Sequence, residues 1–280
     1  MSTTLVSKIG PAVLRALAPK ASGAKANSQT AVIVGFGAML PELLASIDVT
    51  TPVRIAHFLS QTAHESDGFC TTVEYASGAA YEGRKDLGNT QAGDGVRFRG
   101  RGPIQLTGRE NYRRFTAWMR NRLPDCPDFE AQPHLVAEWP WAGWAAAFFW
   151  AENNLNALAD RDDLVAVTKR INGGRNGLAD RGAYLVKAKA IIQPIAAELM
   201  QPAQEFPVMF RGSKGEPVEA LQRGLSMYGL PVAIDGDFGP ATELAVKAFQ
   251  RAQALTVDGI AGAKTFAALA PHLPFERDLH

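Results

Sequence analysis

The 280-residue sequence has little cysteine, little net charge and no long apolar run. Its two cysteines, Cys70 and Cys126, lie far apart and form no C-x-x-C motif, which argues against a zinc knuckle and a disulfide framework. The 29 Lys and Arg residues nearly cancel the 28 Asp and Glu residues, so the net charge of +1 gives no basis for a nucleic-acid groove. We therefore expect two free thiols and a partner recognised by shape and hydrogen bonds.

The longest apolar run, residues 31–40, contains two glycines and is much shorter than the roughly 20 residues of a membrane-spanning helix. We expect a soluble chain without a membrane partner. The first 41 residues carry basic but no acidic side chains, and the AKA at 24–26 is similar to the cleavage site of a secretory signal. Pro11 and Arg15 interrupt the apolar core that such a signal needs, so the sequence favours an opening helix of the domain.

Helical periodicity dominates the first 200 residues. Thr51 followed by Pro52 is typical of a helix start, and the apolar spacing predicts a helix from about 52 to 67. The Trp- and Ala-rich residues 139–158 predict a central buried helix, and an NGG turn separates two further helices after it. Between these regions, the glycine-rich residues 88–108 predict a loop or a small hairpin.

The character of the sequence changes at about 200 to 207, where prolines end the helical region. Beyond this boundary, DGDFGPAT (235–242) and DGIAGAKT (258–265) share the positions of Asp-Gly, a second Gly and a Thr, and each leads into an apolar helix. This internal repeat, with one helix before it, predicts a compact three-helix module. The predicted fold is mainly α, with a large helical domain over residues 1–200 and the module over residues 207–272.

Most generic catalytic motifs are absent from the sequence. His64 and Glu65 begin like a zinc-binding H-E-x-x-H helix, but Gly68 stands where the second histidine is needed. There is no G-x-S-x-G nucleophile elbow, no phosphate-binding loop and no local signature around either cysteine. Hydrolysis by paired carboxylates, without a metal or a cofactor, is the chemistry that remains.

Glu65 lies beside Phe58 on the flank of the apolar stripe of the predicted helix, which is a half-buried position. Apolar surroundings raise the pKa of a carboxyl group, as a general acid for glycoside hydrolysis requires. Glu74 follows a chain reversal at Gly68 and is placed to face Glu65 across a cleft, as the base of an inverting enzyme would. By spacing alone, two unrelated surface glutamates explain the pattern better.

Four segments in order resemble glycoside hydrolase family 19, which includes chitinases and lysozyme-like phage endolysins: AHFLSQTAHESDGF, YEGRKDLGN, GDGVRFRGRGPIQLTGRENY and INGGRNGLADR. The resemblance covers roughly residues 13–195 and implies a lysozyme-like, two-lobed helical domain. It also implies that Glu65 is the general acid, that Glu74 is the general base and that Thr107 helps to hold the attacking water. The substrate-binding residues that it implies are Gln105, Asn111, Asn172 and Arg181.

Each of these residues has a simpler alternative. Thr107 is also placed to cap the helix that begins at Gly108, and Asn172 is also typical of a turn with a left-handed backbone. Arg181 would form a surface ion pair or brace a catalytic glutamate. Glu82 competes with Glu74 for the role of base, although the nine-residue spacing from Glu65 favours Glu74.

Residues 210–269 resemble peptidoglycan-binding domain 1, through GSKGEPVEALQ, DGDFGPAT, AVKAFQ and DGIAGAKT. We expect the small core of this module to contain Leu221, Leu225, Ala245, Val246 and Phe249. Asp235 and Asp258 are interpreted as turn formers rather than as ligand contacts.

The two resemblances together imply a monomeric peptidoglycan hydrolase of the endolysin type, with an N-acetylmuramidase activity that inverts the anomeric carbon. The plant chitinases' longer loops and disulfide-bearing cysteines are missing, which favours the cell wall over chitin. A chitinase and a non-enzymatic wall-binding protein are the alternatives. We expect synthesis in a host cytoplasm without a signal peptide, and access to the periplasmic wall through a separate pore protein, a holin.

Overall fold

The computed structural model describes residues 4–200, 207–269 and 272. The chain divides into two compact units, residues 1–200 and residues 201–280, and each is considered by itself. The described residues are mainly helical, and the β-structure among them consists of isolated antiparallel bridges. This confirms the expected fold class. The predicted boundary at about 200 to 207 falls mostly outside the described residues.

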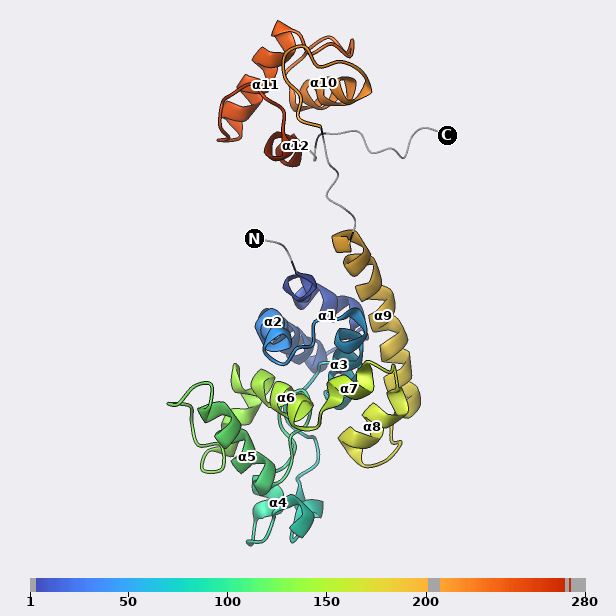
Figure 1. Ribbon diagram of the computed structural model, residues 1–280. Coiled ribbons are helices and arrows are strands. Elements are labelled where there is room, and N and C mark those ends of the chain that lie inside the picture. Colours follow the sequence, from blue (N-terminus) through green and yellow to red (C-terminus); the bar gives the residue numbers. More distant parts are fainter. Residues whose placement is uncertain (1–3, 201–206, 270–271, 273–280) are drawn as a thin grey trace. The chain divides into compact units, whose positions relative to one another are not determined.

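The first unit consists of α-helices joined by loops that carry short 3-10 helices (Figure 1). In chain order these are η1 (Leu5–Lys8), α1 (Pro11–Leu17), α2 (Ala24–Ser46), α3 (Pro52–Glu65), η2 (Ala79–Tyr81), η3 (Lys85–Leu87), α4 (Asp94–Arg97), α5 (Arg109–Arg120), η4 (Pro133–Ala137), α6 (Trp141–Glu152), α7 (Leu155–Ala159), α8 (Leu164–Asn172) and α9 (Leu178–Met200). The single helix expected at 139–158 is two helices, α6 and α7, because Asn154 between them has a left-handed backbone with φ of 50°.

Helix α3 begins where the sequence predicts and is buried along most of its length. Pro52 occupies its first turn, and the Thr51 hydroxyl accepts a hydrogen bond from the backbone N–H of Arg54 at 3.3 Å. The helix ends at Glu65, because the chain then turns through Asp67 and Gly68, which have φ of 53° and 66°. Glu65 therefore lies at the open end of a buried helix.

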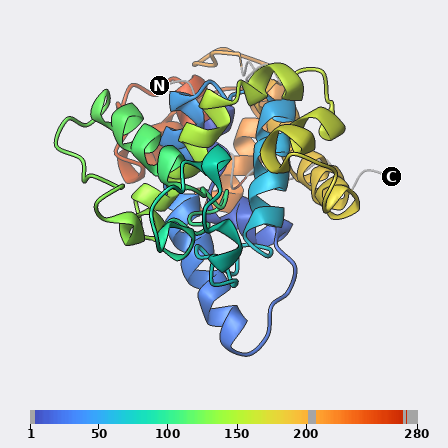
Figure 2. The ribbon, with the colours of Figure 1, turned by 90° about the horizontal axis from the view of Figure 1, so that it is seen from below.

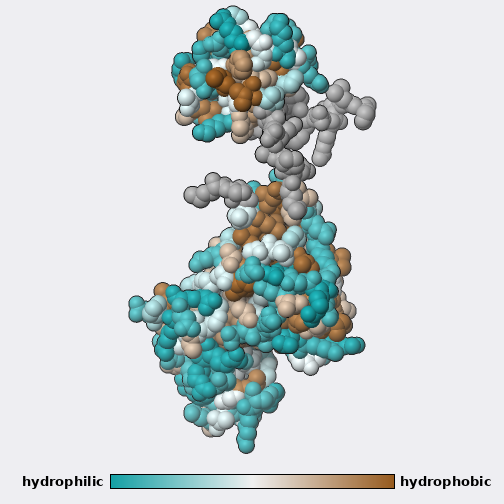
Figure 3. Space-filling model, viewed as in Figure 1, coloured by the Kyte–Doolittle hydropathy of each residue, from teal (hydrophilic) through white to brown (hydrophobic). Residues whose placement is uncertain are grey.

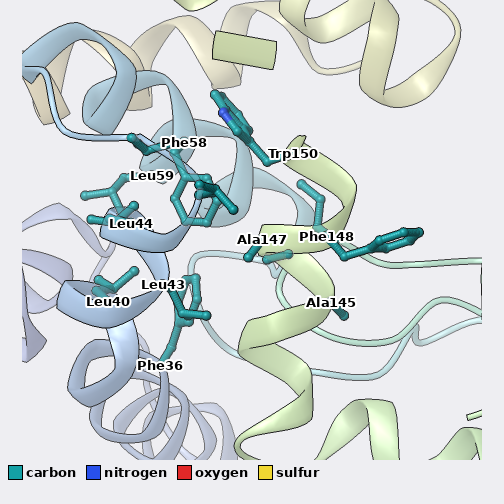
Figure 4. Close-up of a cluster of buried hydrophobic side chains, with 14 of the residues drawn as sticks. Phe36, Leu40, Leu43, Leu44, Phe58, Leu59, Ala145, Ala147, Phe148 and Trp150 are labelled. Atoms are coloured by element: carbon teal, nitrogen blue, oxygen red, sulfur yellow. The ribbon is translucent and has the colours of Figure 1, made fainter. Parts of the chain in front are cut away.

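The core of the first unit forms where α2, α3 and α6 meet. Figure 4 shows Phe36, Leu40, Leu43 and Leu44 of α2, Phe58 and Leu59 of α3, and Ala145, Ala147, Phe148 and Trp150 of α6 in one cluster. Phe58 meets Trp150 edge to face, with ring centroids 5.2 Å apart. This packing fixes the axis of α3 and hence the position of its last turn.

Helices α3 and α9 lie side by side, as both ribbon views show (Figures 1 and 2). Their packing brings residues about 116 positions apart in sequence into contact, including Glu65 with Arg181 and His64 with Asp180. Gly177, just before α9, passes so close to His64 that an added Cβ would lie 2.2 Å from its ring. A side chain at that position would push the two helices apart.

Helix α2 is, among the described residues, the one helix long and apolar enough to cross a membrane by length and composition. It is also a core helix of the first unit: Val32, Ile33, Phe36, Leu40 and Leu43 on it are buried against neighbouring helices. Figure 3 shows a mainly hydrophilic surface over α4 and α5 in the first unit.

The loop between α3 and α5 is held by polar contacts rather than by a sheet. Bridges pair Val73 with Arg101 and Arg101 with Leu106. The buried Asn89 donates to the carbonyl of Tyr81 at 2.9 Å and accepts the backbone N–H of Arg109 at 2.9 Å. This loop carries Glu74, Tyr81, Gln105 and Thr107, so these contacts position half of the candidate site.

The second unit contains α10 (Glu216–Tyr228), α11 (Pro240–Ala252) and α12 (Ala263–Leu269), as the predicted three-helix module requires. Its core includes all five expected residues: Leu221, Leu225, Ala245, Val246 and Phe249.

The internal repeat is also a structural repeat. The buried Gln222 donates to Asp235 Oδ1 and accepts the N–H of Gly236, whereas the buried Gln250 makes the same contacts with Asp258 and Gly259. Asp235 and Asp258 each also accept a backbone N–H two residues on, and these hydrogen bonds lower the pKa of both carboxyl groups. Both aspartates thus form turns, as the sequence predicts.

Candidate active site

A cleft of about 340 Å³ lies in the first unit, between the end of α3 and the loop that follows. Four residues singled out from the sequence line it: Glu65, Glu74, Gln105 and Thr107. His64 also lines it, as do side chains that were not singled out, among them Asp67, Tyr75 and Tyr81. In the part of the chain that the structure describes, no three His, Cys, Asp or Glu side chains are grouped as a metal site would require.

Glu65 is partly buried, with a side chain 18% exposed. It is not surrounded by apolar groups alone, because Nη2 of Arg181 donates to its Oε1. Nη1 of the same guanidinium donates to Oε1 of Gln61 at 2.5 Å, one turn earlier on α3. Of the two alternatives for Arg181, the brace of a glutamate is therefore correct and the surface ion pair is wrong, since Arg181 is 2% exposed.

Glu74 lies in the loop after α3 and accepts two hydrogen bonds. The backbone N–H of Gly100 donates to its Oε2 at 3.0 Å, and the Tyr81 hydroxyl donates to its Oε1 at 2.8 Å. An added Cβ at Gly100 would lie 2.8 Å from Oε1 of Gln105 and 3.2 Å from Oε2 of Glu74. Glycine at this position lets the backbone approach the carboxylate.

Tyr81 is a donor that remains protonated over the neutral range. Burial, together with its hydrogen bond to Glu74, raises the pKa of its hydroxyl to about 12. A phenol in this state gives Glu74 a hydrogen bond without adding charge to the cleft. Tyr81 opens the YEGRKDLGN segment of the family resemblance, but residue spacing does not predict its contact with Glu74, seven residues earlier.

Thr107 does not cap helix α5. The helix begins at Arg109 after Gly108, which has a φ of 94°, and no side chain caps it there. The Thr107 hydroxyl instead donates to the carbonyl of Gln105 at 2.8 Å, so its oxygen can still accept a hydrogen bond, and Thr107 lines the cleft. The capping alternative is therefore wrong.

The other substrate-binding candidates differ in their surroundings. Gln105 lines the cleft, and its amide donates to the carbonyl of Gly102 at 2.9 Å. Asn111 is not part of the lining and donates to the carbonyl of Thr107 at 2.8 Å. It braces the segment that carries Thr107.

Asn172 is the last residue of α8 and not a left-handed turn residue, because Gly173 takes that conformation with a φ of 74°. Its side chain donates to the carbonyl of Asn176 and accepts the N–H of Gly174 at 2.8 Å. The same Asn176 carbonyl accepts Nε of Arg181 at 3.2 Å. Asn172 thus shapes the turn that holds Arg181.

Glu82, the competitor of Glu74, lies outside the residues that line the cleft. Its two oxygens accept the backbone N–H groups of Gly93 at 2.7 Å and Gly95 at 2.8 Å, at the start of α4. These are the N–H groups that a helix start leaves without a helical partner. The contacts give Glu82 a structural role and leave Glu74 as the carboxylate that faces the cleft.

Sequence reasoning missed Gln61 as well as Tyr81. Gln61 precedes Glu65 by four residues, so the two lie on one face of α3, and this spacing was the available signal. Its amide Nε2 is buried without a hydrogen-bond partner among the described residues.

Comparison with known proteins identifies both units. Residues 13–168, more than half of the chain, match the profile of the glycoside hydrolase family 19 chitinases, described as chitinase class I. Residues 214–269 match the profile of a peptidoglycan binding domain. The first match includes Glu65, Glu74 and Thr107 but ends before Arg181.

Individual relatives match parts of the chain. A glycosyl hydrolase family 19 domain-containing protein of Haemophilus influenzae is 34% identical over 39% of this chain and 49% of its own length. An endochitinase of Arabidopsis thaliana is 35% identical over 43% of this chain and 40% of its own length. A zinc D-Ala-D-Ala carboxypeptidase of Streptomyces albus G is 53% identical over 20% of this chain and 23% of its own length. The chain thus spans half or less of each relative.

The first unit carries the two carboxylates in one cleft, and the second matches the profile of a peptidoglycan binding domain. The chain belongs to glycoside hydrolase family 19.

Proposed function

We propose that the protein is a peptidoglycan hydrolase of the N-acetylmuramidase type, which cleaves β-1,4 bonds of the bacterial wall with inversion. The observation that carries the proposal is the shared cleft of Glu65, Glu74 and Thr107. In the proposed reaction, Glu65 donates a proton to the oxygen of the leaving sugar. Glu74 accepts a proton from the water that attacks the anomeric carbon from the opposite face.

The surroundings of the two carboxylates support different roles. Arg181 holds Oε1 of Glu65, so the proposal assigns proton donation to Oε2. Oε2 of Glu74 accepts a hydrogen bond from Gly100 and Oε1 accepts one from Tyr81, which hold the carboxyl group in place in the cleft. Thr107 would position the water through its hydroxyl oxygen. Gln105 would contact the sugar from the same side of the cleft.

The second unit supports the wall as the substrate. A module that binds peptidoglycan keeps the linked catalytic unit at a high local concentration on an insoluble polymer. We propose that the protein acts on the periplasmic wall as a lysis enzyme of the phage type, with a separate pore protein giving it access. No cofactor takes part in the proposed reaction.

The test is digestion of purified sacculi, followed by borohydride reduction and mass spectrometry of the products. Muramitol at the new ends supports the proposal, whereas glucosaminitol would move the cut to the other bond. Anhydro-muropeptides as the main product would defeat the two-carboxylate mechanism, because their formation consumes no water. The first product should carry the α-anomeric hydroxyl, since one displacement inverts the β bond.

The wall-binding role has its own test. A chain that ends at Met200 retains the whole core of the first unit, so it should fold and cut soluble glycan as the full chain does. It should sediment with sacculi much less than the full chain. Equal sedimentation of the two would show that the second unit is not the anchor.

The second candidate function is a chitinase, which the family description and the Arabidopsis relative favour. Soluble product from chitin but not from sacculi would select it. The same assay with both polymers therefore distinguishes the two functions.

A further inference from the structure

Tyr75 has unusual exposure for an aromatic residue of the first unit. Its side chain is 66% exposed, more than that of any other Phe, Tyr or Trp among described residues 4–200. It directly follows Glu74 and lines the same cleft. An exposed aromatic ring next to the proposed base is a feature that packing of the core does not explain.

The hydroxyl of Tyr75 is hydrogen-bonded to Asp67, in the turn that follows α3. It donates to Oδ2 of Asp67 at 2.8 Å, and Nζ of Lys25 donates to the same oxygen at 2.6 Å. Nζ of Lys25 also lies 5.4 Å from the centroid of the tyrosine ring. Three segments thus meet at Asp67: the first turn of α2, the turn after α3 and the loop that carries Glu74.

The ionisation states of Asp67 and Tyr75 at neutral pH are compatible with the hydrogen bond between them. The hydrogen bond from Lys25 lowers the pKa of Asp67, so this carboxylate remains an acceptor. Burial and the bond to Asp67 raise the pKa of Tyr75, so its hydroxyl remains a donor. The tyrosine hydroxyl is therefore hydrogen-bonded while most of the residue stays exposed to solvent.

We propose that Tyr75 is a substrate-binding residue whose ring packs against the C–H face of a pyranose in the cleft, with Asp67 and Lys25 as positioning residues. The inference rests on the proposed cleavage of a glycan and adds the platform that holds one of its sugars. A sugar ring offers a flat face of C–H groups, and the electron-rich face of a phenol ring complements it. Because the hydroxyl is already tied, little side-chain freedom remains to be lost on binding.

The alternative is that Tyr75 merely braces the turn between α3 and the loop. In that case the bond to Asp67 would matter and the exposed ring would not. Two variants distinguish these cases. If Tyr75 acts only through its bond to Asp67, Tyr75→Phe and Tyr75→Ala should weaken sugar binding equally. If the ring itself contacts the sugar, Tyr75→Phe should retain most of the binding.

The experiment measures binding by calorimetry in the Glu65→Gln background, which prevents turnover. The probes are the N-acetylglucosamine tetramer and a wall tetrasaccharide of alternating N-acetylglucosamine and N-acetylmuramic acid. Tyr75→Ala should weaken both by about tenfold, as expected for truncation of a central contact residue. Tyr75→Phe and Lys25→Met should each weaken the binding of both probes about threefold. The double variant should bind no more weakly than either single one, because both changes act on the orientation of the same ring. Leu123→Ala, which removes an exposed apolar side chain outside the cleft, should change neither.

Steady-state kinetics of the active enzyme provide an independent test. Thermal unfolding of every variant shows whether it is folded. Tyr75→Ala should raise KM about tenfold and change kcat less than threefold, since the ring does not touch the reacting atoms. Binding of both probes by Tyr75→Ala within twofold of its parent would overturn the inference. So would equal losses in Tyr75→Ala and Tyr75→Phe. Cleavage of the N-acetylglucosamine tetramer but not of wall glycan would overturn the muramidase proposal alone, and failure of the parent to bind either probe would overturn both.

Discussion

Arg181 of α9 donates a hydrogen bond to Glu65 at the end of α3, and its side chain is almost completely buried. A buried guanidinium needs acceptors for its N–H groups, because an unpaired buried donor is costly, and Glu65 and Gln61 supply them. The arrangement therefore couples the proposed acid to the packing of two helices. Changes at Glu65 should affect stability as well as catalysis.

Glu65→Gln should abolish hydrolysis, because the amide cannot donate the proton that the leaving oxygen needs. It should also lower the free energy of unfolding by about 1 to 3 kcal/mol, since an amide replaces the carboxyl group that accepts the hydrogen bond of the buried Arg181. Reducing-end release and urea denaturation measure the two effects. Appreciable residual hydrolysis by a folded variant would exclude Glu65 as the acid.

The same substitution at two nearby glutamates separates a catalytic role from a structural one. Glu74→Gln should reduce kcat about 100-fold or more, because the water loses its base. Glu82→Gln should leave kcat unchanged and cost about 1 to 2 kcal/mol of stability, since one of its two bonds to Gly93 and Gly95 is lost. The reverse pattern, with Glu82→Gln inactive, would assign the base to Glu82.

Thr107 offers a matched pair of variants. Thr107→Ser keeps the hydroxyl and should retain most activity, whereas Thr107→Val keeps the shape and should lower kcat about 10- to 100-fold by releasing the water. Steady-state kinetics on soluble glycan measure both. Equal activity of the two variants would show that the hydroxyl has no part in the reaction.

Local signals in the sequence predicted the helices and the repeat. Thr51 and Pro52 predicted the start of α3, and the two Asp-Gly turns predicted the module, because each depends on neighbours within a few residues. The split of α6 from α7 was missed, since a left-handed Asn154 leaves little trace in periodicity. The catalytic pair depended on the resemblance to family 19.

The contacts that surround the pair could not be predicted in the same way. Arg181 meets Glu65 across 116 positions, and the hydrogen bonds of Glu74 come from Tyr81 at the end of η2 and from Gly100, 26 residues away. Such contacts follow from tertiary packing, which residue spacing does not encode. The roles of Glu82 and Thr107 were ambiguous in the sequence for this reason. Only the folded loop shows that Glu82 contacts the start of α4 and that Thr107 lines the cleft.

The pH dependence of stability should have a contribution from His57, which is buried in α3 away from the cleft. Its Nε2 lies 2.8 Å from Oδ1 of Asp162, and its Nδ1 has no partner among the described residues. Lys189 donates to the other oxygen of Asp162, and Asp163 is also close enough to act on the imidazole charge. Burial dominates over these carboxylates and lowers the pKa of His57 from its ordinary value of 6.5.

His57→Gln should therefore flatten the loss of stability on acidification. Below pH 6.5 the unfolded chain binds a proton at His57 that the folded chain does not, so the free energy of unfolding of the parent falls as the pH falls toward the folded pKa. The slope from one such group is at most about 1.4 kcal/mol per pH unit. Glutamine can still donate to Asp162 but does not titrate, so its stability deficit relative to the parent should shrink between pH 7.5 and 5.5. Urea denaturation at both values measures this difference, and a deficit that stays constant would mean that His57 takes up its proton equally in both states.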